Sequence, residues 1–128
     1  INLENKVLTV DFQNAKSGNT RHIPLNTQAF NVLSDWQKLS GNIGYVFKDN
    51  NHQRIVDFRY DWAALLEDAS ITNFRFHDLR HHFASKLVMA SVDLNTVREL
   101  LGHSDLKMTL RYAHLAPEHK AAAVNLIG

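Results

Sequence analysis

His77-Asp78-Leu79-Arg80-His81-His82-Phe83-Ala84-Ser85 opens the part of the chain that decides its fold and its chemistry. Leu100-Leu101-Gly102-His103 and Arg111-Tyr112-Ala113-His114 follow it. Five of the eight histidines lie between residues 77 and 114. Imidazole titrates near neutral pH, so this clustering predicts a functional site in the second half of the chain.

Apolar residues at helical spacing predict four helices here, over residues 78–90, 94–101, about 104–113 and 118–126. Asp93 is expected to cap the second of these, and Gly102 to close it in a left-handed conformation. Pro117 suits the first turn of the last helix. The expected core residues of this half are Leu79, Phe83, Leu87, Leu100, Leu101 and Leu115.

The first half begins with two short runs, residues 7–12 and 21–25, that have the apolar pattern of strands. Turn-forming residues 14–19 between them predict a β-hairpin with Lys16 near its tip. Helices are expected from Thr27, as the cap, to Ser40 and over residues 57–69. The predicted fold class is α+β and mainly α, a small antiparallel hairpin packed on a helical body in one domain, residues 1–128.

The amino-acid composition excludes several classes of protein and of chemistry. The chain has 128 residues, 45% of them hydrophobic and 21% charged, which excludes disordered and low-complexity classes. It has no cysteine, which excludes disulfides, thiol catalysis and cysteine-bound zinc. No apolar run is long enough to span a membrane, so a cytoplasmic protein is expected. The formal net charge of +1 does not by itself indicate a nucleic-acid partner.

His77, Arg80 and His81 share one face of the predicted helix, and this spacing has two interpretations from the residues alone. His-x-x-x-His is the spacing of a helical zinc pair, with Asp78 where metalloproteases carry a glutamate base. The permanent charge of Arg80 on the same face opposes zinc. In the other interpretation, these histidines only bond to backbone at the start of a helix. His82 and His81 are expected to support Arg80.

Three ordered boxes, His-x-x-Arg, Leu-Gly-His and a tyrosine nine residues after that histidine, resemble the signature of the tyrosine recombinases, the phage integrase family. The resemblance covers most of the chain and is closest to integrases of bacterial phages and prophages. It implies the catalytic fold that breaks and rejoins DNA. It also implies site-specific integration or excision through a 3′-phosphotyrosine intermediate.

The resemblance implies a role for five residues. Tyr112 is the expected nucleophile, and Arg80 is expected to clamp the oxygens of the scissile phosphate. His77 matches the position of proton transfer at the tyrosine, and His103 the one that hydrogen-bonds the phosphate. Lys16 matches the lysine that protonates the departing 5′-oxygen. Arginine and imidazole can supply the charge and the proton transfers, so no metal or cofactor is expected.

The implied substrate is duplex DNA at attachment sites in the bacterial nucleoid. The implied assembly is a homotetramer of the intact protein on synapsed DNA, with accessory DNA-bending proteins as further partners and no membrane partner. The last helix is a candidate for docking into a neighbouring subunit.

The sequence departs from the family at one catalytic position. Family members carry another catalytic arginine before the hairpin, whereas Arg21 comes after Lys16 and does not fit that order. We therefore expect residues 1–128 to be the carboxy-terminal part of a catalytic domain, without its first arginine and the amino-terminal DNA-binding domains. Alone it is expected to be inactive. The alternative is a non-catalytic DNA-binding or regulatory module with a degenerate integrase fold.

Overall fold

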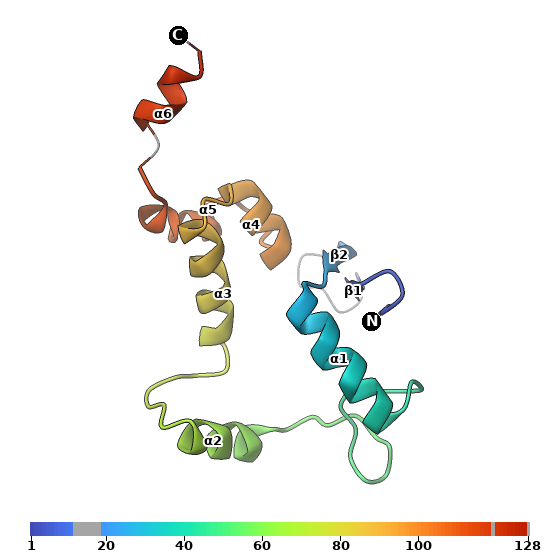
Figure 1. Ribbon diagram of the computed structural model, residues 1–128. Coiled ribbons are helices and arrows are strands. Elements are labelled where there is room, and N and C mark those ends of the chain that lie inside the picture. Colours follow the sequence, from blue (N-terminus) through green and yellow to red (C-terminus); the bar gives the residue numbers. More distant parts are fainter. Residues whose placement is uncertain (12–18, 119, 128) are drawn as a thin grey trace. The chain divides into compact units, whose positions relative to one another are not determined.

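The computed structural model describes residues 1–11, 19–118 and 120–127. The chain divides into two compact units, Ile1–Phe74 and Arg75–Gly128, called the first and the second unit below. Figure 1 shows a mainly helical chain with one small sheet, which confirms the predicted fold class. No helix in the described ranges is both long enough and apolar enough to cross a membrane.

The first unit contains the two strands and the two longer helices of the amino-terminal half. Strands β1 (Val7–Val10) and β2 (Arg21–Pro24) pair antiparallel, with Val7 opposite Pro24 and Val10 opposite Arg21. The chain then enters α1 (Thr27–Ser40), and α2 (Arg59–Asp68) follows a long connection. The hairpin pairing and both helices were predicted.

The residue that caps α1 differs from the predicted one. Asn26, not Thr27, has the extended backbone of a capping residue, and its side-chain oxygen accepts a hydrogen bond from Ala29 N at 2.8 Å. An amide oxygen at this position satisfies one of the amide N–H groups that have no partner within the first helical turn. Thr27 is therefore the first residue of the helix.

All regular secondary structure in the described part of the second unit is helical. It contains α3 (Asp78–Met89), α4 (Leu94–Leu101), α5 (Lys107–Leu110), a 3₁₀ turn (Ala113–Leu115) and α6 (Lys120–Asn125). The single helix predicted over residues 104–113 is wrong. Tyr112 N bonds to Thr109 O, and Leu115 N to Tyr112 O, so the chain tightens to three-residue spacing around Tyr112.

The core of the second unit forms where α3 and α4 meet the segment around Tyr112. Its buried residues are Ala84, Val88, Val97, Leu101 and Tyr112. Leu87, Val92, Leu94 and Leu115 pack against them.

Three of the six expected core residues, Leu79, Phe83 and Leu100, are not among these residues, and Leu100 is partly buried. Leu79 and Phe83 are each 44% exposed. Leu79 and Phe83 share a stripe of α3 that lies about 140° around the helix from the stripe of Ala84 and Val88. The core therefore uses the stripe of α3 that carries Ala84 and Val88.

Both predicted ends of α4 are confirmed. Asp93 accepts a hydrogen bond from Thr96 N at 2.9 Å, which caps the start of the helix. Gly102 has φ 69° and ψ 34°, in the left-handed region. Gly102 N bonds to Glu99 O, and His103 N bonds back to Arg98 O, which together form a Schellman motif. The motif fixes the backbone direction at His103.

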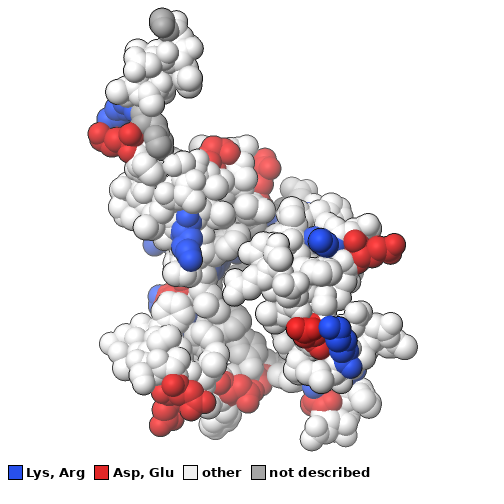
Figure 2. Space-filling model, in the orientation of Figure 1, with Lys and Arg blue, Asp and Glu red and all other residues white. Residues whose placement is uncertain are grey.

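Charged side chains of both signs occur on the face drawn in Figure 2, in several places side by side, with wide white areas between these groups. The sequence contains 14 basic and 13 acidic residues, so neither sign predominates in it. Charge distribution therefore does not indicate a function, and the contacts of individual side chains must be considered instead.

Candidate active site

Tyr112 is the centre of the candidate site and also a core residue, with only 6% of its surface exposed. Its hydroxyl oxygen lies 2.6 Å from Nδ1 of His81 on α3. The two ring centroids are 6.0 Å apart. The guanidinium carbon of Arg111 lies 6.0 Å from the centre of the tyrosine ring. The phenol therefore contacts the imidazole of His81, which lies on α3, and the guanidinium of Arg111, the residue that precedes it in the chain.

The contact between His81 and Tyr112 is one that sequence reasoning missed. His81 was expected to support Arg80, and the structure instead joins it to the tyrosine. Its ring also meets that of His77 edge to face, with centroids 5.2 Å apart and planes at 77°. The spacing of four residues between the two histidines is the sequence signal for this stacking. A continuous row of three rings results, from His77 through His81 to Tyr112.

Arg80 links α3 to the end of α4. Its Nη2 donates a hydrogen bond to the carbonyl oxygen of Leu101 at 2.5 Å. Carbonyls at a helix carboxyl end carry partial negative charge, which a guanidinium stabilises. Leu101 is followed by Gly102 and His103, so this bond brings the guanidinium to the turn that presents His103.

His103 is held by a buried hydroxyl. Its Nδ1 lies 2.8 Å from Oγ1 of Thr109, and Thr109 is completely buried. The Nδ1 edge of the ring is therefore turned towards α5.

Asp78 has a structural partner at the start of α3. Its carboxylate accepts hydrogen bonds from the Arg75 backbone N at 2.8 Å and from Arg75 Nη2 at 2.9 Å. These bonds lower the pKa of Asp78 to about 2. The carboxylate is thus engaged by Arg75 and does not stand as a general base beside His77 and His81.

The zinc interpretation finds no third ligand in the described ranges. There, no three His, Asp or Glu side chains come close enough together to hold a metal ion. Nδ1 of His81 is directed at the Tyr112 hydroxyl.

Four of the five predicted catalytic residues, all but Lys16, belong to the second unit. His77 and Arg80 lie at the start of α3, His103 follows α4, and Tyr112 follows α5. Lys16 lies outside the described residues. The structure thus places the four described residues in one compact unit, and the catalytic role of each residue stays a prediction.

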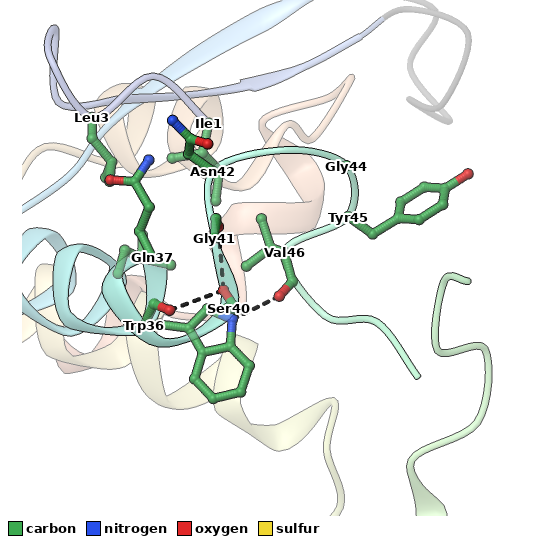
Figure 3. Close-up of a pocket in the computed structure, with 11 residues that line it drawn as sticks. Ile1, Leu3, Trp36, Gln37, Ser40, Gly41, Asn42, Gly44, Tyr45 and Val46 are labelled. Atoms are coloured by element: carbon green, nitrogen blue, oxygen red, sulfur yellow. Dashed lines mark hydrogen bonds between the residues drawn. The ribbon is translucent and has the colours of Figure 1, made fainter. Parts of the chain in front are cut away.

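A small open pocket lies elsewhere, between α1 and the chain that follows it in the first unit (Figure 3). The indole N–H of Trp36 donates to the carbonyl of Val46 at 2.7 Å, which ties that chain to the helix. The pocket contains no acidic, basic or histidine side chain and none of the predicted catalytic residues. It is therefore separate from the candidate site.

Comparison with known proteins identifies the family. The Phage integrase family matches residues 1–119, which is most of the chain. The chain belongs to the phage integrase family. The integrase of Salmonella phage P22 is 36% identical over 133 aligned positions, covering 93% of this chain and 34% of that protein. Tyrosine recombinase XerC of Xanthomonas campestris is 37% identical, over 83% of this chain and 34% of that protein.

Solved structures agree with this assignment. The catalytic domain of bacteriophage HP1 integrase superposes with a TM-score of 0.72 at 29% identity, over 96% of this integrase-family chain and 66% of that chain. XerA recombinase superposes with a TM-score of 0.75 at 22% identity, which supports the fold alone. The chain spans about a third of the length of the P22 and XerC proteins that it matches.

Proposed function

We propose that this chain is the carboxy-terminal part of the catalytic domain of a site-specific tyrosine recombinase, which integrates or excises DNA through Tyr112. The observation that carries the proposal is the Tyr112 hydroxyl held 2.6 Å from an imidazole nitrogen, in a unit that also contains Arg80, His77 and His103. Family membership supports the same reaction class.

In the proposed reaction, the Tyr112 oxygen attacks a phosphorus of duplex DNA and its proton passes to an imidazole. The bond from phosphorus to the 5′-oxygen breaks, which leaves a 3′-phosphotyrosine and a 5′-hydroxyl that has gained a proton. Lys16 is the proposed donor of that proton. Arg80 neutralises charge on the phosphate oxygens, since a planar guanidinium bonds two oxygens at once. The reverse attack by another 5′-hydroxyl rejoins the strands without ATP.

The substrate is an attachment site in duplex DNA, and the working assembly is a homotetramer on two synapsed duplexes, aided by DNA-bending proteins. The chain alone is inactive, because its relatives are about three times longer and the family's first arginine has no counterpart at the expected order in residues 1–128. Losing one such charge-stabilising group typically slows a reaction by about two to three orders of magnitude.

The test uses the longer protein that contains this chain and nicked duplexes enriched for binding from a randomised pool. We expect a covalent complex that survives denaturing electrophoresis. Tyr112→Phe should abolish that complex and leave DNA binding near the wild-type level. Tyr60→Phe, a change at a tyrosine that is 89% exposed in the first unit, is the matched control and should form the complex normally.

An undiminished complex in Tyr112→Phe would contradict the assignment of the nucleophile. DNA binding by the longer protein without any covalent complex would support the non-catalytic module instead. Rapid cleavage by the 128-residue chain alone would contradict its proposed inactivity.

A further inference from the structure

Thr109 occupies a special place in the second unit. It has no exposed surface and is the buried polar residue of the described chain. Burying a hydroxyl is unfavourable unless it makes a hydrogen bond, and the bond it makes is to Nδ1 of His103 at 2.8 Å. Its backbone carbonyl also accepts the N–H of Tyr112 at 3.0 Å. One residue therefore contacts both His103 and the segment that carries the proposed nucleophile.

The hydroxyl can meet the imidazole in two ways. If it donates to Nδ1, the neutral ring carries its proton on Nε2. If it instead accepts from an Nδ1–H, Nε2 carries a lone pair. The second arrangement leaves the hydroxyl proton for a backbone carbonyl in the preceding turn, a common bond for threonine in helices. The choice between them sets whether Nε2 of His103 donates or accepts.

A phosphate diester offers only acceptor oxygens to such a ring. A lone pair on Nε2 would repel them, whereas an Nε2–H would bond to them. We propose that Thr109 is a positioning residue for DNA cleavage: its buried hydroxyl donates to Nδ1 of His103 and holds the ring as the Nε2–H tautomer, aimed at the scissile phosphate. This inference rests on the proposed function, since it gives His103 a phosphate to bind.

The geometry allows the hydroxyl to be removed without disturbing Tyr112. Thr109→Val keeps the branched shape of the side chain and the backbone carbonyl that receives the Tyr112 N–H, and it deletes only the bond to His103. Thr109→Ser restores a hydroxyl at the same carbon. Thr96→Val is a matched control in the same unit, because that hydroxyl bonds to the Asp93 carboxylate and not to a histidine.

The first measurement needs no DNA. Nitrogen-15 spectra of the 128-residue chain, labelled in its histidine rings, report the tautomer of His103, whose signals are identified by their loss in His103→Gln. At a pH where the ring is neutral, we expect the Nε2–H form in the wild type and in Thr109→Ser. Thr109→Val should shift His103 towards the tautomer mixture of a free imidazole. An Nδ1–H ring in the wild type, or no change in Thr109→Val, overturns the proposal.

The second measurement is the rate of covalent complex formation by the longer protein. Loss of one hydrogen bond predicts a rate about tenfold lower in Thr109→Val, with Thr109→Ser and Thr96→Val within about twofold of wild type. In a His103→Gln background, Thr109→Val should have no further effect, because its action passes through that ring. An equal loss in both backgrounds indicates a packing role and overturns the proposal.

The two measurements separate this inference from the function on which it rests. If the wild type forms no covalent complex, the proposed function fails. The tautomer of His103 and its response to Thr109→Val then still decide whether the hydroxyl orients the ring.

Discussion

The hydrogen bond between Tyr112 and His81 gives a prediction about stability that does not depend on DNA. Tyr112→Phe keeps the aromatic ring among its neighbours Ala84, Val88 and Val97 and removes only the hydroxyl. We expect this change to destabilise the second unit.

The size of the effect follows from the contact. The hydroxyl and Nδ1 lie 2.6 Å apart in a partly buried setting. A neutral hydrogen bond contributes about 0.5–1.5 kcal/mol, and a buried group left without its partner costs about 1–3 kcal/mol. Because His81 is only partly buried, water can solvate part of the stranded nitrogen. The expected loss in unfolding free energy is therefore about 1–2 kcal/mol.

The assay is urea unfolding followed by methyl NMR signals of Val88 and Val97, which are core residues of the second unit. Tryptophan fluorescence does not report on this unit, since Trp36 and Trp62 both lie in the first. Adding His81→Leu closes a double-mutant cycle, in which we expect a coupling energy of about 1 kcal/mol between the two side chains.

Tyr60→Phe serves again as the control, because that ring is 89% exposed. A loss below about 0.5 kcal/mol in Tyr112→Phe, the usual range for surface changes, would refute the reasoning. So would a coupling energy of zero, which would mean that the two groups are close without stabilising the fold.

Two further predictions concern the turn at Gly102 and the ion pair between Arg75 and Asp78. Gly102→Ala puts a side chain on a left-handed backbone at φ 69° and should destabilise the second unit by about 1 kcal/mol, measured by circular dichroism during urea unfolding. Because Arg75 lowers the pKa of Asp78 to about 2, the folded state favours the charged carboxylate. The resulting stability is present above the ordinary carboxyl pKa of 3.8 and is lost as pH falls towards 2. Thermal melts across that range should show a smaller acid-induced decline in Asp78→Asn than in the wild type, and equal declines would contradict the role of the pair.

Local signals explain which parts of the fold were predictable from sequence. Both ends of α4 were, because Asp93 and Gly102 act through backbone groups within a few residues of themselves. The exposure of Leu79 and Phe83 was not, since it depends on which stripe of α3 the core uses. The break near Tyr112 was missed for a related reason, because Tyr112 packs in a core with residues of α3 and α4 that only the tertiary fold brings to it.

In the candidate site, too, some features were predictable from the sequence and others were not. The order of the three boxes was enough to predict that His77, Arg80, His103 and Tyr112 matter, and all four fall within the second unit. The contacts of His81 and Thr109 depend on how α5 and the following turn meet α3 and His103. Nothing in the spacing of the boxes indicates which side-chain atoms lie within hydrogen-bonding distance.

The ring and the hydroxyl of Tyr112 have separate partners, because the ring packs in the core and the hydroxyl lies beside Nδ1 of His81. Packing retains an aromatic ring at this position, whereas both the bond to His81 and the proposed chemistry retain the oxygen. In lineages where DNA cleavage has ceased to matter, only the stability of about 1–2 kcal/mol from that bond still retains the oxygen, so we expect phenylalanine at position 112 to be tolerated more often there. Phenylalanine at this position would therefore mark a lineage that no longer cuts DNA.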